Sequence, residues 1–299
     1  MKKTILFFVF VLTAFNFCLA QEWFTSLEVA KKLALVQDKM LFVMWENATR
    51  YPYPVLINTE KDESIVTDLF EDERINKLIW DYFVPVIIYE SKYAELSQQV
   101  KETRGAKYFN KLIDDRIKIM DVNGNILNIN TSPDESIEDL SLLIKRYALN
   151  TAFLKQELVN YSKDKNLTTA FSLASKYLDF AVFAEKSLRL EIIQLANIYF
   201  EESKSYLAKS GLKNKKGFLQ NCDLQIIKEH LILNKPRKAL RYLKKFDITD
   251  IDSLNLSLFS SLYYTGFNLL RDKANATLWK SKISLVDLKK AILIINNNF

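Results

Sequence analysis

The chain has very few of the residues that build metal centres and disulfide frameworks. Its 299 residues include one histidine and two cysteines. Zinc sites of the usual nitrogen and sulfur ligation, iron–sulfur clusters and disulfide scaffolds need more such ligands than this. We therefore expect no metal site and no cofactor, and no catalytic residue can be named from a familiar motif.

Turn-forming residues are also scarce, with five glycines and five prolines. Hydrophobic residues make up 49% of the chain and charged residues 26%, so the chain can bury a sizeable core and is neither disordered nor of low complexity. Few turn formers favour helices. A single core rarely grows past about 250 residues, so this length predicts two domains.

The first twenty residues have the pattern of a cleaved signal peptide. Lys2 and Lys3 are followed by an apolar run from Ile5 to Phe15, and the segment ends in Cys18-Leu19-Ala20, with a small residue at the expected cleavage point. The run is shorter than the ~20 residues that span a bilayer. We expect cleavage after Ala20 and an exported, periplasmic protein of bacterial type.

Two alternatives to cleavage after Ala20 remain open. The segment could be retained as a signal anchor, or Cys18 could carry a lipid, although Phe15-Asn16-Phe17 lacks the small residue that such a site prefers. Membrane association is expected only if Cys18 is lipidated. Cleavage after Ala20 would leave Cys222 as the only thiol, so no internal disulfide could form.

The charge balance is basic but modest. The formal net charge is +6, and cleavage would lower it by the two charges of Lys2 and Lys3. Such a value, in a compartment that holds little nucleic acid, predicts no nucleic-acid binding.

Residues 21–148 alternate short apolar runs with helical patterns and predict an α/β domain. The runs Met40–Trp45 and Phe83–Tyr89 suit strands buried on both faces of a parallel sheet. Asn123-Gly124 between two apolar runs predicts a hairpin. Helices are expected over Trp23–Gln37, over Asp72–Tyr82, and over Ile137–Leu149 after a start at Pro133 and Asp134.

This order of elements resembles the thioredoxin superfamily, in particular its exported bacterial members. Those domains open with a Trp and a helix of the form SLxxAxxxA, followed by a Lys and a strand that ends in Trp-Cys-x-x-Cys. The matching residues here are Trp23, Ser26-Leu27, Ala30, Ala34, Lys39 and Leu41–Trp45, and later Arg74–Val86 and Ile119–Leu127. The resemblance covers about residues 22–148 and implies the fold more than the function.

The chain departs from that family where the redox chemistry would lie. After Trp45, Glu46 and Thr49 stand where the two cysteines would be, and neither can attack a disulfide. The family's cis-proline would fall close to Asp115, yet Lys111–Ile119 contains no proline. The stretch Tyr51–Phe70 is longer than the family needs and receives no assignment.

Residues 149–299 show helical periodicity almost throughout and predict an all-helical domain. Apolar faces run along Leu167–Asp179 and Glu185–Glu201. A shift of about 35 residues aligns apolar positions, close to the 34-residue tetratricopeptide period. The aligned pairs are Leu219 with Leu254, Leu224 with Phe259, Ile227 with Leu262, Ala239 with Ala274 and Leu243 with Leu278. Pro236–Phe246 is similar to the second helix of such a unit, but an irregular bundle fits nearly as well.

Several residues could carry chemistry, and each has a plainer interpretation. His230 has no second histidine or nearby cysteine to work with. Acidic residues at Glu60–Glu63 and Glu71–Glu73 favour helix starts or solvent. The basic residues could meet an anionic partner or simply form a solvated face; they are Lys213, Lys215, Lys216, Lys235, Arg237, Lys238, Arg241, Lys244 and Lys245. Tyr51 and Tyr53 form either a contact patch or a rigid turn.

These observations favour a non-catalytic, exported protein that binds another envelope protein, because helical repeats offer extended binding surfaces. The alternative is a component of a thiol–disulfide pathway, or an enzyme of unrecognised chemistry. In both cases the expected architecture is a thioredoxin-like α/β domain followed by a helical, repeat-like domain.

Overall fold

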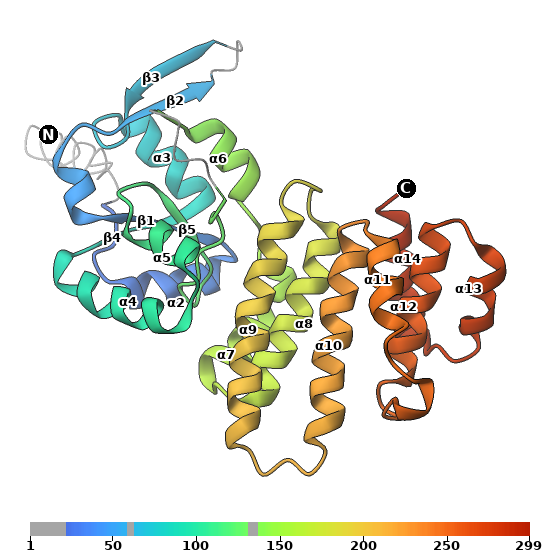
Figure 1. Cartoon of the computed structure of the whole chain (residues 1–299). Coiled ribbons are helices and arrows are strands. Elements are labelled where there is room, and N and C mark those ends of the chain that lie inside the picture. Colours follow the sequence, from blue (N-terminus) through green and yellow to red (C-terminus); the bar gives the residue numbers. More distant parts are fainter. Residues whose placement is uncertain (1–21, 59–62, 131–136) are drawn as a thin grey trace, which may run out of the picture. The chain divides into compact units, whose positions relative to one another are not determined.

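The structure, a computed structural model, describes residues 22–58, 63–130 and 137–299. The chain divides into two compact units, residues 1–150 and residues 151–299 (Figure 1). The expected signal peptide over residues 1–20, the acidic residue Glu60 and the expected helix start at Pro133 and Asp134 lie outside the described residues.

A three-stranded sheet forms the centre of the first unit. Its strands are β1 (Met40–Trp45), β4 (Phe83–Ile88) and β5 (Lys118–Met120), in the order β4-β1-β5. β1 runs parallel to β4 and antiparallel to β5. All six residues of β1 are buried, which is why that strand reads as a continuous apolar run. Single bridges extend the sheet at both edges, one between Phe24 and Val86 and one between Met120 and Ile126.

Among the described residues of this unit, five helices accompany the strands. They are α2 (Leu27–Gln37), α3 (Glu73–Tyr82), α4 (Glu90–Thr103), α5 (Ala106–Ile113) and α6 (Leu140–Tyr147). α2 starts four residues after the predicted Trp23, because Phe24 pairs with β4 and Ser26 caps the helix by accepting the N–H of Val29. The Asp72 carboxylate caps α3 in the same way.

The predicted turn at Asn123-Gly124 is present. Gly124 has a φ of 88°, which a residue with a side chain rarely adopts, and the Asp121 carboxylate accepts the N–H groups of Asn123 and Asn125, both at 2.9 Å. Beyond the turn the ladder is short, because only Ile126 bridges back to Met120.

The unassigned stretch of residues 51–70 contains two strands of a second sheet. β2 (Pro54–Asn58) pairs antiparallel with β3 (Ser64–Asp68) and parallel with β6 (Glu138–Asp139), in the order β3-β2-β6. This pairing corrects the prediction of a helix from Ile137. Since Glu138 and Asp139 pair with β2, the helix begins only at Leu140, with Asp139 as its N-cap.

The second unit is helical throughout its residues 151–299. Its elements are η2 (Ala152–Leu154), α7 (Lys155–Lys163), α8 (Leu167–Phe183), α9 (Arg189–Lys209), α10 (Lys215–Ile232), α11 (Pro236–Leu243), η3 (Ile248–Asp250), α12 (Leu256–Leu269), α13 (Lys273–Lys280) and α14 (Leu285–Asn296). Helix pairs follow one another along the chain, α8 with α9, α10 with α11 and α12 with α13 (Figure 1). The coarse prediction of packed helical hairpins is thus confirmed.

The predicted repeat relates the pair α10 and α11 to the pair α12 and α13, and it holds only for buried positions of the first helices, α10 and α12. Leu224, Ile227, Phe259 and Leu262 are all buried, on α10 and α12. The second helices do not follow the same register, because Leu243 is buried whereas its aligned residue Leu278 is 70% exposed. In α13 the buried alanine is Ala276 rather than the predicted Ala274. Leu219 and Leu254, which are aligned with each other, are both exposed, so this pair lies outside the packed core.

One buried arginine links the middle of the helical unit to its C-terminal end. Arg189, only 5% exposed, donates hydrogen bonds to the carbonyl oxygens of Ile232 at 3.0 Å and Asn297 at 3.1 Å. It also donates to the side chain of Asn298 at 2.8 Å. The start of α9, the end of α10 and the C-terminal residues are therefore held together by one side chain.

Candidate functional site

Glu46 and Thr49 lie together at the end of β1, in the short helix η1 (Glu46–Arg50). The Glu46 carboxylate accepts hydrogen bonds from Arg50 at 3.3 Å and from the N–H of Glu90 at 3.4 Å, at the start of α4. The Thr49 hydroxyl donates to the carbonyl oxygen of Glu46 at 2.8 Å. Both side chains thus serve the local structure of the turn.

Tyr51 and Tyr53 have different surroundings. Tyr51 is 75% exposed. Tyr53 is half-buried, and its hydroxyl donates to the Glu138 carboxylate at 2.6 Å, which ties the turn to β6. Burial, together with the charge of Glu138, raises the pKa of the Tyr53 hydroxyl well above its ordinary value. Only Tyr51 presents its ring to solvent.

The acidic residues predicted to favour helix starts do so at Asp72. Its carboxylate binds Arg74 at 2.7 Å, and this hydrogen bond lowers the pKa of Asp72 to about 2. Within the described residues, no three His, Cys, Asp or Glu side chains are arranged to hold a metal ion. Nothing in residues 22–58, 63–130 and 137–299 therefore adds a metal centre to the site.

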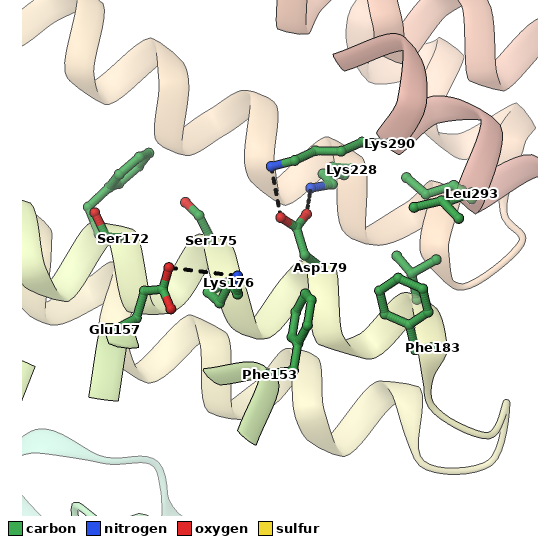
Figure 2. A pocket seen from close by; sticks show the side chains of 13 residues that line it. Phe153, Glu157, Ser172, Ser175, Lys176, Asp179, Phe183, Lys228, Lys290 and Leu293 are labelled. Atoms are coloured by element: carbon green, nitrogen blue, oxygen red, sulfur yellow. Dashed lines mark hydrogen bonds and ion pairs between the residues drawn. The ribbon is translucent and has the colours of Figure 1, made fainter. Parts of the chain in front are cut away.

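A hollow lies among the helices of the second unit. It has a volume of about 490 Å³ and is walled mainly by α8, α10, α14 and the turn before α7. Figure 2 shows Phe153, Phe183 and Leu293 on one side, and Ser172 and Ser175 on the other. Phe183 is 54% exposed, so part of the apolar wall faces solvent. A hollow with apolar walls and a few polar groups is the usual form of a binding site.

A buried ion cluster forms the floor of this hollow. The Asp179 carboxylate lies 2.7 Å from the ammonium of Lys228 and 2.7 Å from that of Lys290 (Figure 2). Burial alone would raise the pKa of Asp179, but the two ammonium groups outweigh it and hold the pKa below its ordinary value. Asp179 is therefore ionised at neutral pH.

The two lysines of the cluster differ in access. The side chain of Lys228 is 5% exposed and that of Lys290 is 42% exposed. Lys228 is thus a buried structural partner of Asp179, while Lys290 reaches the rim and can meet a ligand. Lys176 adds a third cation, 4.1 Å from the centre of the Phe153 ring and 3.8 Å from the Glu157 carboxylate.

A smaller hollow of about 290 Å³ continues the first toward α12. The two share Phe171, Ser175, Lys228, Lys290 and Ile294, so together they form one groove along α8, α10, α12 and α14, called the inner groove below. Three buried polar atoms of residues that line it have no hydrogen-bond partner, the Oε2 of Glu157, the Oγ of Ser175 and the Oε1 of Gln225. Unpaired buried polar atoms carry a free-energy cost that a bound polar group can remove.

The sequence alone did not reveal the inner groove. The apolar pattern places Asp179 only at the end of an amphipathic helix, and its partners Lys228 and Lys290 lie far along the chain. Lys228 did carry a signal, because it interrupts the apolar positions Leu224, Ile227 and Leu231 of one buried helix. A lysine among buried apolar positions needs a counter-ion, but the sequence pattern does not identify that counter-ion.

Comparison with protein-family models, with curated proteins and with solved structures gives no match for this chain. Among the described residues, no helix is both long enough and apolar enough to cross a membrane. The site must therefore be interpreted from its own geometry.

Proposed function

We propose that this chain is a non-catalytic binding protein of the bacterial envelope, and that the inner groove of its helical unit holds a segment of another envelope protein. The observation that carries the proposal is the groove itself. It combines an exposed phenylalanine, a rim lysine and three unpartnered buried polar atoms along the helices α8, α10, α12 and α14.

Each part of the inner groove matches one need of a bound peptide. Phe153, Phe183 and Leu293 can take up an apolar side chain. Ser175 and Gln225 can exchange hydrogen bonds with main-chain groups of the segment. Lys290 favours a carboxylate near the apolar residue. A short acidic and apolar segment therefore suits the groove best.

We infer a supporting role for the first unit, with a thioredoxin-like fold that has lost its redox site. The support for this fold is the strand order β4-β1-β5, with one parallel and one antiparallel neighbour, widened by the bridges at Phe24 and Ile126. Glu46 and Thr49 hold the turn after β1 through hydrogen bonds that involve no thiol. Such a unit would keep the fold of the family without its thiol–disulfide chemistry.

Export remains part of the proposal and has its own test. Lys2, Lys3 and the apolar run before Ala20 support a cleaved signal peptide. Mass spectrometry of the exported protein should find a mature end that starts at Gln21. Lipid on Cys18 would instead support a membrane-anchored form.

Capture experiments with matched variants test the groove. Phe183 and Leu278 are both exposed apolar residues, but only Phe183 lines the groove. We expect wild type and Leu278→Ser to retain the same partner from an envelope extract, and Phe183→Ser combined with Lys290→Glu to lose it. Equal capture by all three proteins would refute binding at the groove. Turnover of a thiol or peptide substrate would favour the enzymatic alternative.

A further inference from the structure

A second cavity lies on the other side of α10, between that helix and α11. It has a volume of about 550 Å³ and is separate from the inner groove, with no lining residue in common. Its apolar part is made by Ile226, Ile227, Tyr242 and Phe246. Its polar lining residues are Asp223, His230, Lys238 and Lys245.

Three cations gather around the aromatic ring of this cavity. The ammonium of Lys245 lies 4.9 Å from the centre of the Tyr242 ring, the guanidinium of Arg241 5.7 Å and the ammonium of Lys238 5.9 Å. Within the described part of the chain, none of these three makes an ion pair, although many other lysines do. Their shared position around one ring therefore leaves a concentrated positive charge without a counter-ion.

His230 lies next to the same tyrosine and close to these cations. Its ring stacks on Tyr242 at 5.4 Å between ring centres. Burial, and then the charges of Lys238, Lys235 and Arg241, lower the pKa of His230 below its ordinary value. Asp223 is the one acidic lining residue. Burial raises the pKa of its carboxyl above the ordinary value, and this single carboxyl faces more cations than it can balance.

We propose that the cavity between α10 and α11 binds an anionic amphiphile, with its phosphate or carboxylate at Lys238 and Lys245 and its apolar chain against Ile226, Ile227 and Phe246. An anion at this place completes the charge balance of the rim. An apolar chain covers surface that otherwise faces water in the cavity. The site does not depend on the inner groove, so either can exist without the other.

The chain has one histidine, which makes this proposal directly measurable. The ring C–H signals of His230 can be followed by NMR during pH titration without ambiguous assignment. Hexyl phosphate should raise the pKa of His230 by ~0.5 unit or more, because an anion close to the ring favours its charged form. Inorganic phosphate alone and hexyl glucoside, which each lack one half of the ligand, should bind at least tenfold more weakly.

Lysine variants separate a site from general attraction to a basic surface. The combined change Lys238→Gln and Lys245→Gln should weaken hexyl phosphate binding at least tenfold, whereas Lys213→Gln, in the exposed turn before α10, should leave it unchanged. Equal weakening by the two sets would overturn the proposal. So would the absence of any His230 shift, or binding of phosphate alone as tight as that of hexyl phosphate.

Vesicle sedimentation identifies the source of the amphiphile. If wild-type protein sediments with phosphatidylglycerol vesicles but not with phosphatidylcholine vesicles, and the Lys238→Gln, Lys245→Gln variant does not sediment, the ligand is a lipid in a bilayer. If hexyl phosphate binds and the vesicles do not, the ligand is a soluble amphiphile. Both results support the cavity as a binding site. Sedimentation that persists in the variant would overturn it.

Discussion

The two units bury lysines in opposite ways. In the first unit, Lys118 is fully buried and donates to the carbonyl oxygen of Arg116 at 2.8 Å and to the side chain and main chain of Asp114. Its partners lie within four residues of it. In the second unit, Lys228 is bound by Asp179, a residue of another helix, at the floor of an open groove.

This difference separates a structural charge from a candidate binding charge. Burial lowers the pKa of Lys118 to about 8, yet its side chain is fully buried and bound by residues just before it in the chain, so an altered pKa alone does not mark a site. Asp179 also forms an ion pair with Lys290, which reaches solvent at the rim of the groove. Access to a cavity, rather than burial, is what makes the second cluster useful to a ligand.

The largest effect is expected at Arg189. Its replacement by methionine leaves the carbonyl oxygens of Ile232 and Asn297 without their donor and should lower the free energy of unfolding by about 3–5 kcal/mol. Chemical denaturation measures the change. Arg237→Met, on the exposed face of α11, is the control and should cost less than about 0.5 kcal/mol. A loss below about 1 kcal/mol at Arg189 would mean that α9, α10 and the C-terminal residues are held together by other contacts.

A smaller loss is expected from Asp179→Asn. The substitution removes the charge that balances Lys228 and should destabilise the protein by about 2–4 kcal/mol. Adding Lys228→Met should restore part of that loss, because no unpaired charge then remains buried. Urea unfolding of the single and double variants measures this recovery. If the double variant were less stable than Asp179→Asn, the unpaired lysine would not be the source of the loss.

A pH-dependent effect is expected at Glu229. Burial raises the pKa of its carboxyl to about 7 although Asn197 donates to it. A raised acid pKa means that stability is complete at pH values below about 4.5 and falls as pH rises toward 7, by up to about 3 kcal/mol. Glu229→Gln should abolish this decline and be more stable than wild type at pH 8. An unchanged slope between pH 5 and 7 would place the titration elsewhere.

The strands of the first unit could be predicted because burial on both faces leaves an uninterrupted apolar run. β1 matches its predicted bounds, and β4 ends one residue early. Helix α4 was missed for the opposite reason. None of its fourteen residues is buried, so it has no apolar stripe to reveal a helical period. β2 and β3 have mixed burial, and β6 has only two residues, too few to form a pattern.

The candidate site was harder to predict than the fold. Asp179, Lys228 and Lys290 lie on three helices, and only folding brings them together. The basic residues of α11 were noticed in the sequence, but not their grouping around Tyr242 opposite His230. A pattern read along one helix shows its face, whereas a cavity depends on which faces meet.

The smallest effect is expected for thiol chemistry, where both units should be inert. The turn after β1 carries Glu46 and Thr49, and Cys222 is fully buried in α10. Burial raises the pKa of the Cys222 thiol to about 11, so almost none of it is thiolate at pH 7. We expect no reduction of insulin disulfides above background by the wild-type protein or by Cys222→Ser. The thiol should react with a disulfide reagent only after unfolding.

Two results would contradict inertness in different ways. Activity that disappears in Cys222→Ser would require the buried thiol to become exposed through local opening of α10, which hydrogen exchange at that helix would detect. Activity that persists in Cys222→Ser but is lost in Glu46→Ala would place chemistry at the turn after β1. That outcome would place the functional site in the first unit instead of the helical unit. A residue that only holds the turn should change stability when it is replaced, without changing the rate of turnover.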